Sequence, residues 1–195
     1  MNRRVFLAIN LPENIKKKLA RYEDKWPEIP ARWTKEYNLH ITLVFLGYVR
    51  DENLIDIIKK TEQVCKNHSP FEIIFNKIIY GPKDKKPAKM IWVVGDKNDN
   101  LSRLAGELEN ELLSGVSQNM EKYLPQKKEI RKAFSPHITL ARIKQFQLHR
   151  MEEEAIPEID ENVDFNFDVN SIEVMESELK KSGPSYTILE SIPLK

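Results

Sequence analysis

The sequence predicts an α+β fold built from two mainly antiparallel sheets flanked by helices. Strand-like and helix-like segments alternate along all 195 residues. Their order is not a regular βαβ series, which favours antiparallel pairing. The tetrapeptide His-Ile-Thr-Leu occurs twice, at 40–43 and 137–140. Both copies lie in strong strand candidates, so the chain is expected to contain two related halves.

Each strand and helix expected in the first half of the chain is indicated by a local sequence feature. Apolar runs of roughly four to eight residues have the length of buried strands. Pro12 is tolerated in the first turn of a helix, where a backbone N–H would be unpaired anyway, and Asp51 and Glu52 supply the negative charge that a helix N-terminus favours. We expect strands at 5–9, 31–34, 39–46 (closed by Gly47), 71–80 and 90–94, and helices opening at Pro12 and Asp51.

In the second half, one apolar stripe defines a helix and alternation defines the strands. The stripe begins near Asn100 and consists of Leu101, Leu104, Leu108, Leu112 and Val116. We expect strands at 136–142, 163–174 and 186–194, and a short helix within 145–161. The polar, basic stretch 117–133 is a long connection for a compact domain. No segment has the composition of an interdomain linker, so residues 1–195 are expected to form a single domain.

Composition excludes several classes of protein. Lys and Arg number 31 against 30 Asp and Glu, a net charge of +1, whereas proteins that coat nucleic acid or anionic membranes usually carry a large basic excess. A small enzyme that binds one phosphate at an RNA end is still compatible with this balance. A single cysteine, Cys65, excludes an internal disulfide framework. The apolar N-terminal run stops at Pro12, short of a signal peptide, and no membrane-spanning run is present, so we expect a soluble cytoplasmic protein.

The two repeated motifs are the residues that carry chemistry. The chain has 4 His and few Thr, so chance does not readily place Thr two positions after two of these histidines. Side chains two apart on a strand face the same way, roughly 7 Å apart. His40 and Thr42 therefore share one face, as do His137 and Thr139. If a pseudo-twofold axis relates the two strands, these faces meet across a groove.

Such a pair suits acid–base chemistry on a phosphate. A neutral imidazole removes a proton while a protonated one donates a proton, and an ordinary pKa of about 6.5 makes both forms accessible near neutral pH. The hydroxyls of Thr42 and Thr139 can donate to non-bridging phosphate oxygens. No carboxylate or cysteine recurs at ligand spacing near both histidines, so we expect no metal and no cofactor. His68 and His149 lack this context and are expected to be exposed.

The sequence around the motifs resembles a known group of enzymes, the 2H phosphoesterase superfamily, named for its two histidines. The combination is similar to the RNA 2′,3′-cyclic phosphodiesterase branch, also called 2′-5′ RNA ligase-like, and the resemblance covers the whole chain. The segments that carry it are Arg4–Pro12, Asn38–Gly47, Ile91–Gly95, Phe134–Arg142, Met175–Leu179 and Gly183–Tyr186.

The resemblance implies a bilobal, pseudo-twofold α+β fold with a central cleft between the two His-x-Thr strands. It implies metal-independent hydrolysis of a terminal 2′,3′-cyclic phosphate on RNA to a 2′-phosphate. In this branch the first histidine, His40 here, is the proton donor to the leaving oxygen. The second, His137 here, is the proton acceptor that activates water. The implied partner is an RNA 3′ end, with no membrane and no obligate protein partner, and we expect a monomer.

Arg142 is the residue whose position conflicts with its implied role. The resemblance suggests it as a phosphate ligand, which suits a guanidinium. However, Arg142 follows His137 by five positions, and strict alternation would aim it at the opposite face. Phosphate binding by Arg142 therefore requires the strand to end, twist or bulge near Ala141.

Other functions fit the same residues. The substrate of a phosphodiesterase could instead be a small cyclic nucleotide, an ADP-ribose cyclic phosphate or a 2′-5′ linkage. Reversible 2′-5′ RNA ligation would use the same acid and base. A non-catalytic RNA-end-binding module is the alternative from another class, although a binder has no need of two proton-transfer groups. The basic stretches 83–89 and 127–132 either extend the RNA contact or are solvated loops.

Overall fold

The computed structural model describes residues 2–82, 87–113, 134–181 and 183–195 of the 195-residue chain. Among these, the strands are β1 (Asn2–Asn10), β2 (Ala31–Trp33), β3 (His40–Arg50), β4 (Phe71–Gly81), β5 (Met90–Gly95), β6 (His137–Ile143), β7 (Asp160–Val169), β8 (Ser171–Lys180) and β9 (Gly183–Pro193). The helices are α1 (Glu13–Ala20), α2 (Asp51–Cys65), α3 (Asp99–Leu113) and α4 (Gln145–Leu148), with short 3₁₀ turns η1 (Arg21–Lys25), η2 (Glu36–Asn38) and η3 (Glu153–Ala155).

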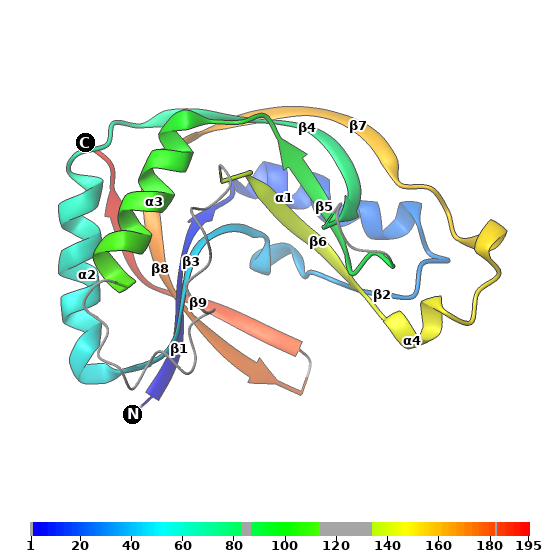
Figure 1. Ribbon diagram of the computed structural model, residues 1–195, viewed down its shortest axis with the longest axis horizontal. Helices are drawn as coiled ribbons and strands as arrows, with labels where there is room; N and C mark the ends of the chain where they lie inside the picture. The colour runs from blue at the N-terminus through cyan, green and yellow to red at the C-terminus, as the bar shows by residue number, and fades with distance from the viewer. Residues whose placement is uncertain (1, 83–86, 114–133, 182) are drawn as a thin grey trace.

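The strands form two antiparallel sheets, as the sequence predicts. One has the order β3-β1-β8-β9 and the other the order β2-β6-β5-β4-β7. In Figure 1, α2 and α3 lie side by side along the first sheet, while the second sheet extends toward α4. The two motif strands, β3 and β6, belong to different sheets and contact each other. This contact is what brings the two halves of the chain together.

Apolar side chains pack on both faces of β1, a central strand of the first sheet. On β1 the buried side chains Val5, Leu7 and Ile9 belong to the same apolar cluster as Leu101 and Leu104 of α3. The alternate side chains of β1, Phe6 and Ala8, form a second small cluster with Met175 on the opposite face. Burial of these apolar surfaces on both sides holds the first sheet in place.

Two strand boundaries differ from those predicted. The expected strand over 163–174 is two strands in different sheets, β7 and β8, separated at Asn170. The buried positions are odd-numbered at the end of β7 (Phe167 and Val169) but include Ile172 and Val174 at the start of β8, so the alternation changes phase where the chain changes sheet. The strand expected to close at Gly47 instead continues through it, and Gly47 has a φ of +73°, a conformation that glycine adopts without steric cost.

His68 is not exposed, contrary to the prediction. Only 1% of its surface is accessible, and its Nε2 lies 2.9 Å from Oε2 of Glu107. The polar residues around His68 in the sequence suggested an exposed side chain. Its partner Glu107 belongs to α3, which packs against α2, so the burial of His68 depends on a residue far away in the sequence. His68 therefore links the end of α2 to α3. His149 is exposed, as expected.

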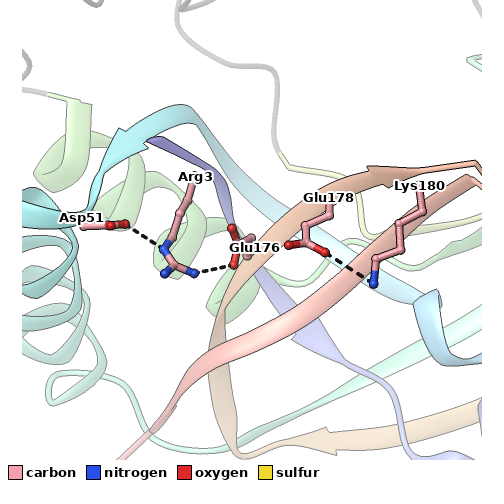
Figure 2. A network of polar contacts seen from close by, with 5 residues as sticks. All are labelled: Arg3, Asp51, Glu176, Glu178 and Lys180. Atoms are coloured by element: carbon pink, nitrogen blue, oxygen red, sulfur yellow. Dashed lines mark hydrogen bonds and ion pairs between the residues drawn. The ribbon is translucent and has the colours of Figure 1, made fainter. Parts of the chain in front are cut away.

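The outer end of β1 is fixed by a polar network. The Arg3 guanidinium donates to Oδ1 of Asp51 at 2.8 Å and to Oε2 of Glu176 at 2.8 Å, while Lys180 and Glu178 form a neighbouring ion pair (Figure 2). The Arg3 charge and hydrogen bond lower the pKa of the Asp51 carboxyl. Arg3 thus ties β1 to the start of α2 and to β8.

Candidate functional site

Both motif strands place histidine and threonine on the same face, as the sequence predicts. In β3, His40 and Thr42 are partly exposed and Ile41 is buried; in β6, His137 and Thr139 are partly exposed and Ile138 is buried. The two imidazoles are carried by strands that contact each other, β3 and β6.

His40 is held on both ring nitrogens. Its Nδ1 lies 2.7 Å from the Asn38 carbonyl oxygen, and its Nε2 lies 2.9 Å from the Thr42 hydroxyl. A carbonyl can only accept, so Nδ1 carries a hydrogen and donates it. Nε2 is then the nitrogen that gains and loses the titrating proton. Thr42 donates to Nε2 when it is unprotonated and accepts from it when it is protonated.

Aromatic rings enclose the same histidine. The ring centres of Phe6 and Tyr186 each lie 5.1 Å from that of His40, and Tyr186 meets it edge-on. Burial lowers the pKa of His40, and the nearby positive charges of Arg142 and His137 lower it further; the hydrogen bond to Asn38 acts in the opposite direction. A lowered pKa makes the protonated ring a stronger acid.

His137 has an equivalent anchor and a different aromatic neighbour. Its Nδ1 donates to the Ser135 carbonyl oxygen at 3.1 Å, so its Nε2 is also the titrating atom. Burial lowers its pKa, and the bond to Ser135 opposes that effect. The Trp92 ring lies 4.3 Å from the His137 ring, tilted by 36°. Gly81 makes this placement possible, because a Cβ there would overlap the indole.

A β-bulge in β6 resolves the conflict over Arg142. On β6, Thr139 pairs with Trp92 and Ala141 with Ile91, so Leu140 is skipped. The extra residue reverses the alternation, and Arg142 emerges, exposed, on the face of Thr139. The required bulge is therefore present, at Leu140.

The same bulge occurs in β3 and reveals an asymmetry between the two halves. On β3, Thr42 pairs with Ala8 and Val44 with Leu7, so Leu43 is skipped. Phe45 consequently occupies the position that Arg142 has in the other half, five residues after its histidine. Phe45 is 57% exposed, and its ring centre lies 6.0 Å from that of Phe6. No role for Phe45 was predicted from the sequence, although its offset from His40 equals that of Arg142 from His137.

Asn38 is a second residue with a role at the site that was not predicted from the sequence. Its side chain is 3% exposed; Nδ2 donates to the Pro184 carbonyl at 2.7 Å and Oδ1 accepts from the Tyr186 N–H at 3.2 Å. Its own carbonyl holds His40. One residue thus fixes both the first histidine and the strand that carries Tyr186.

Replacing Asn38 should destabilise the protein. The Asn38→Ala change leaves two backbone groups of β9 without their partner, and we expect the free energy of unfolding to fall by about 1–3 kcal/mol. Urea denaturation measures this. Asn38→Asp retains the acceptor for Tyr186 but loses the donor to Pro184, so it should also be destabilised. An unchanged midpoint for Asn38→Ala would contradict the linking role.

We also considered a metal site, the Cys65 thiol and a surface depression as candidate functional sites. Among the described residues, no group of three or more His, Cys, Asp or Glu side chains is arranged to hold a metal ion. Burial raises the pKa of the Cys65 thiol to about 12, which disfavours a nucleophilic thiolate. A depression lined by Asn2, Arg50, Asp51 and Glu52 lies at the far end of β1 and β3, where Asn2 pairs with Arg50, whereas Asn10 pairs with His40.

The duplicated arrangement has a counterpart among known proteins. The model of one family, described as LigT-like phosphoesterase, matches the chain twice, over residues 9–92 and 93–186. Each match contains one His-Ile-Thr-Leu motif. The chain belongs to the LigT-like phosphoesterase family. This confirms the predicted superfamily and the duplication that the repeated motif indicated.

Individual relatives agree with the family assignment. Proteins named RNA 2′,3′-cyclic phosphodiesterase match from Aquifex aeolicus, with 30% identity over 86% of this chain and 84% of the relative, and from Methanocaldococcus jannaschii, with 29% identity over 96% and 98%. A crystal structure from Thermus thermophilus superposes with a TM-score of 0.80 at 26% identity, covering 98% of this chain and 97% of that one. Escherichia coli LigT complexed with 3′-AMP, at 23% identity, shares the fold with a TM-score of 0.74 over 100% of this chain and 99% of that one.

These comparisons confirm the α+β fold class and the phosphoesterase family. The basic stretch 127–132 and residues 83–86 of the stretch 83–89 lie outside the described residues, as does Val116 of the predicted helical stripe. None of the helices in the described part of the chain combines the length and apolar character needed to cross a bilayer.

Proposed function

We propose that the protein hydrolyses the 2′,3′-cyclic phosphate at an RNA 3′ end to a 2′-phosphate, without a metal ion, as a cytoplasmic monomer. The observation that carries the proposal is the pair of Nδ1-anchored histidines on contacting strands, each next to a threonine. The names of the relatives, RNA 2′,3′-cyclic phosphodiesterase, support this choice of substrate.

The two imidazoles divide the proton transfers. Nε2 of His137 accepts a proton from water as the water oxygen attacks phosphorus. Nε2 of His40 donates its proton to the 3′ oxygen as the bond between phosphorus and that oxygen breaks. One water is consumed, a 2′-phosphate and a free 3′ hydroxyl form, and both rings then exchange protons with solvent.

The environment of each histidine favours its proposed role. Burial and, to a smaller extent, the Arg142 charge lower the pKa of His40. The protonated ring is therefore a stronger acid than an ordinary imidazolium, once an anionic substrate has favoured its protonation. His137 gains positive charge during the reaction, and the nearby Trp92 face stabilises a cation. Thr42, Thr139 and Arg142 would hold the non-bridging oxygens as negative charge develops on them.

The product distinguishes this function from the alternatives. We expect an oligoribonucleotide ending in a 2′,3′-cyclic phosphate to be opened in the presence of EDTA and without a nucleoside triphosphate. Chromatography against standards should identify the 2′-phosphate isomer. Loss of activity in EDTA that one divalent cation restores would contradict the metal-free mechanism. A 3′-phosphate product would mean that the other ring oxygen leaves.

Ligation would use the same groups, because it is the same ring opening with a different nucleophile. A 5′ hydroxyl in place of water would attack the cyclic phosphate and form a 2′-5′ linkage, with His137 as base and His40 as acid. In dilute aqueous solution water outcompetes a second RNA end, so we propose that hydrolysis dominates. Incubating an oligoribonucleotide that ends in a 2′,3′-cyclic phosphate with a high concentration of an oligonucleotide that bears a 5′ hydroxyl would measure the ligation component.

A further inference from the structure

Two arginines lie directly opposite each other beside the motif face of β6. Arg32 of β2 pairs in register with Arg142 of β6, and both side chains are exposed. Residues directly opposite in an antiparallel pair project from the same face, a few ångströms apart. Arg32 therefore shares the face of Arg142, which the bulge at Leu140 aligns with Thr139.

Strand β2 is fixed firmly enough to hold this position. The Thr34 hydroxyl donates to the Thr139 carbonyl at 2.8 Å, and the Thr34 N–H donates to the Leu140 carbonyl at 2.7 Å. Trp33 stacks on Trp26 with 6.4 Å between ring centres and packs on the main core. Because Trp33 faces the core, alternation turns Arg32 outward.

Neither guanidinium has an acidic partner in the described part of the chain. Among the described residues, the Arg142 guanidinium contacts the sulfur of Met90 at 3.9 Å, and neither Arg142 nor Arg32 forms an ion pair with a carboxylate. Like charges directly opposite each other in a sheet are destabilising. Two unpaired arginines in that arrangement are suited to an anionic ligand that lies over both.

We propose that Arg32 binds the phosphodiester on the 5′ side of the terminal nucleotide, while Arg142 binds the cyclic phosphate. This inference rests on the proposed function and extends it from a single phosphate to a strand of RNA. Successive phosphates of a strand are separated by one nucleoside, and each can accept two parallel hydrogen bonds from a guanidinium. The site would then distinguish an RNA 3′ end from a cyclic mononucleotide.

Two substrates that differ by one phosphate test the inference. Adenosine 2′,3′-cyclic phosphate has only the reacting phosphate, whereas the dinucleotide ApA with a terminal 2′,3′-cyclic phosphate has the additional phosphodiester. For Arg32→Gln we expect KM for the dinucleotide to rise about tenfold with the mononucleotide kinetics unchanged. The slope of log(kcat/KM) against log salt for the dinucleotide should become shallower by about 0.7. Arg103→Gln, which removes an exposed arginine from α3, should change neither.

Stability provides a readout that is independent of turnover. Removing one of two opposed positive charges should leave the urea midpoint of Arg32→Gln equal to or above that of the wild type, whereas a structural arginine would lower it. Equal effects on both substrates, or no effect on either, would overturn the inference while leaving wild-type hydrolysis intact. If the wild type opened neither cyclic phosphate, the proposed function itself would fail.

Discussion

Replacing either motif histidine with alanine is expected to lower kcat/KM by about 10²–10⁴-fold, the usual contribution of a general acid or base. His40 and His137 each present Nε2 as the titrating atom because Nδ1 is bonded to a carbonyl. One imidazole cannot donate a proton to the leaving oxygen and accept a proton from water in the same step, so both histidines are needed. Steady-state kinetics on a cyclic-phosphate oligoribonucleotide measures the loss, with circular dichroism and the urea midpoint as controls for folding.

The dependence of kcat/KM on pH identifies which histidine is the proton donor and which is the proton acceptor. Wild-type kcat/KM should be bell-shaped. His137→Ala should flatten the acidic limb, where the base becomes protonated, and His40→Ala the basic limb, where the acid loses its proton. The limbs belong to an interacting pair, since protonated His137 lowers the pKa of His40. Responses in the opposite order would exchange the two roles.

Non-additivity gives a further check on the pair. Because the two histidines act as a unit, the double alanine variant should be little slower than either single variant. Thr42→Ala and Thr139→Ala should each lose less, since each removes one hydroxyl donor. A folded single histidine variant with near-wild-type turnover would contradict the acid–base assignment.

Local patterns were sufficient to predict antiparallel sheets and the shared strand face of each motif histidine and its threonine. The His-x-Thr spacing fixes one face of a strand because alternation in a strand has a period of two, and Ile41 and Ile138 are buried on the opposite face as predicted. The helix at Asp51 begins where the two acidic residues indicated. These features depend only on residues close together in the sequence.

Features that depend on pairing between distant segments were not predictable in this way. The bulge at Leu140 arises from pairing with β5, and it places Arg142 on the face that strict alternation excludes. Arg32 lies beside Arg142 only because β2 pairs with β6, more than a hundred residues later. The buried His68 depends likewise on Glu107, from another helix. In each case the deciding partner is remote in the sequence.

Removing the Arg142 side chain is expected to lower kcat/KM by about 10²-fold, the scale measured when one donor to a developing oxyanion is lost. The bulge places this guanidinium on the face of Thr139 and His137, and its charge lowers the pKa of His40. Arg142→Lys keeps the charge but loses the planar pair of donors, so its activity should lie between those of Arg142→Ala and the wild type.

The pH profile separates a phosphate ligand from an ordinary surface arginine. Because the positive charge of Arg142 lowers the pKa of His40, Arg142→Ala should raise that pKa. The basic limb of kcat/KM, which reports loss of the His40 proton, should then move to higher pH, while Arg142→Lys leaves it near the wild-type position. Arg103→Ala, another exposed arginine, should change neither rate nor limb. An Arg142→Ala enzyme with unaltered kcat/KM and basic limb would show that this arginine is only a surface residue at the strand end.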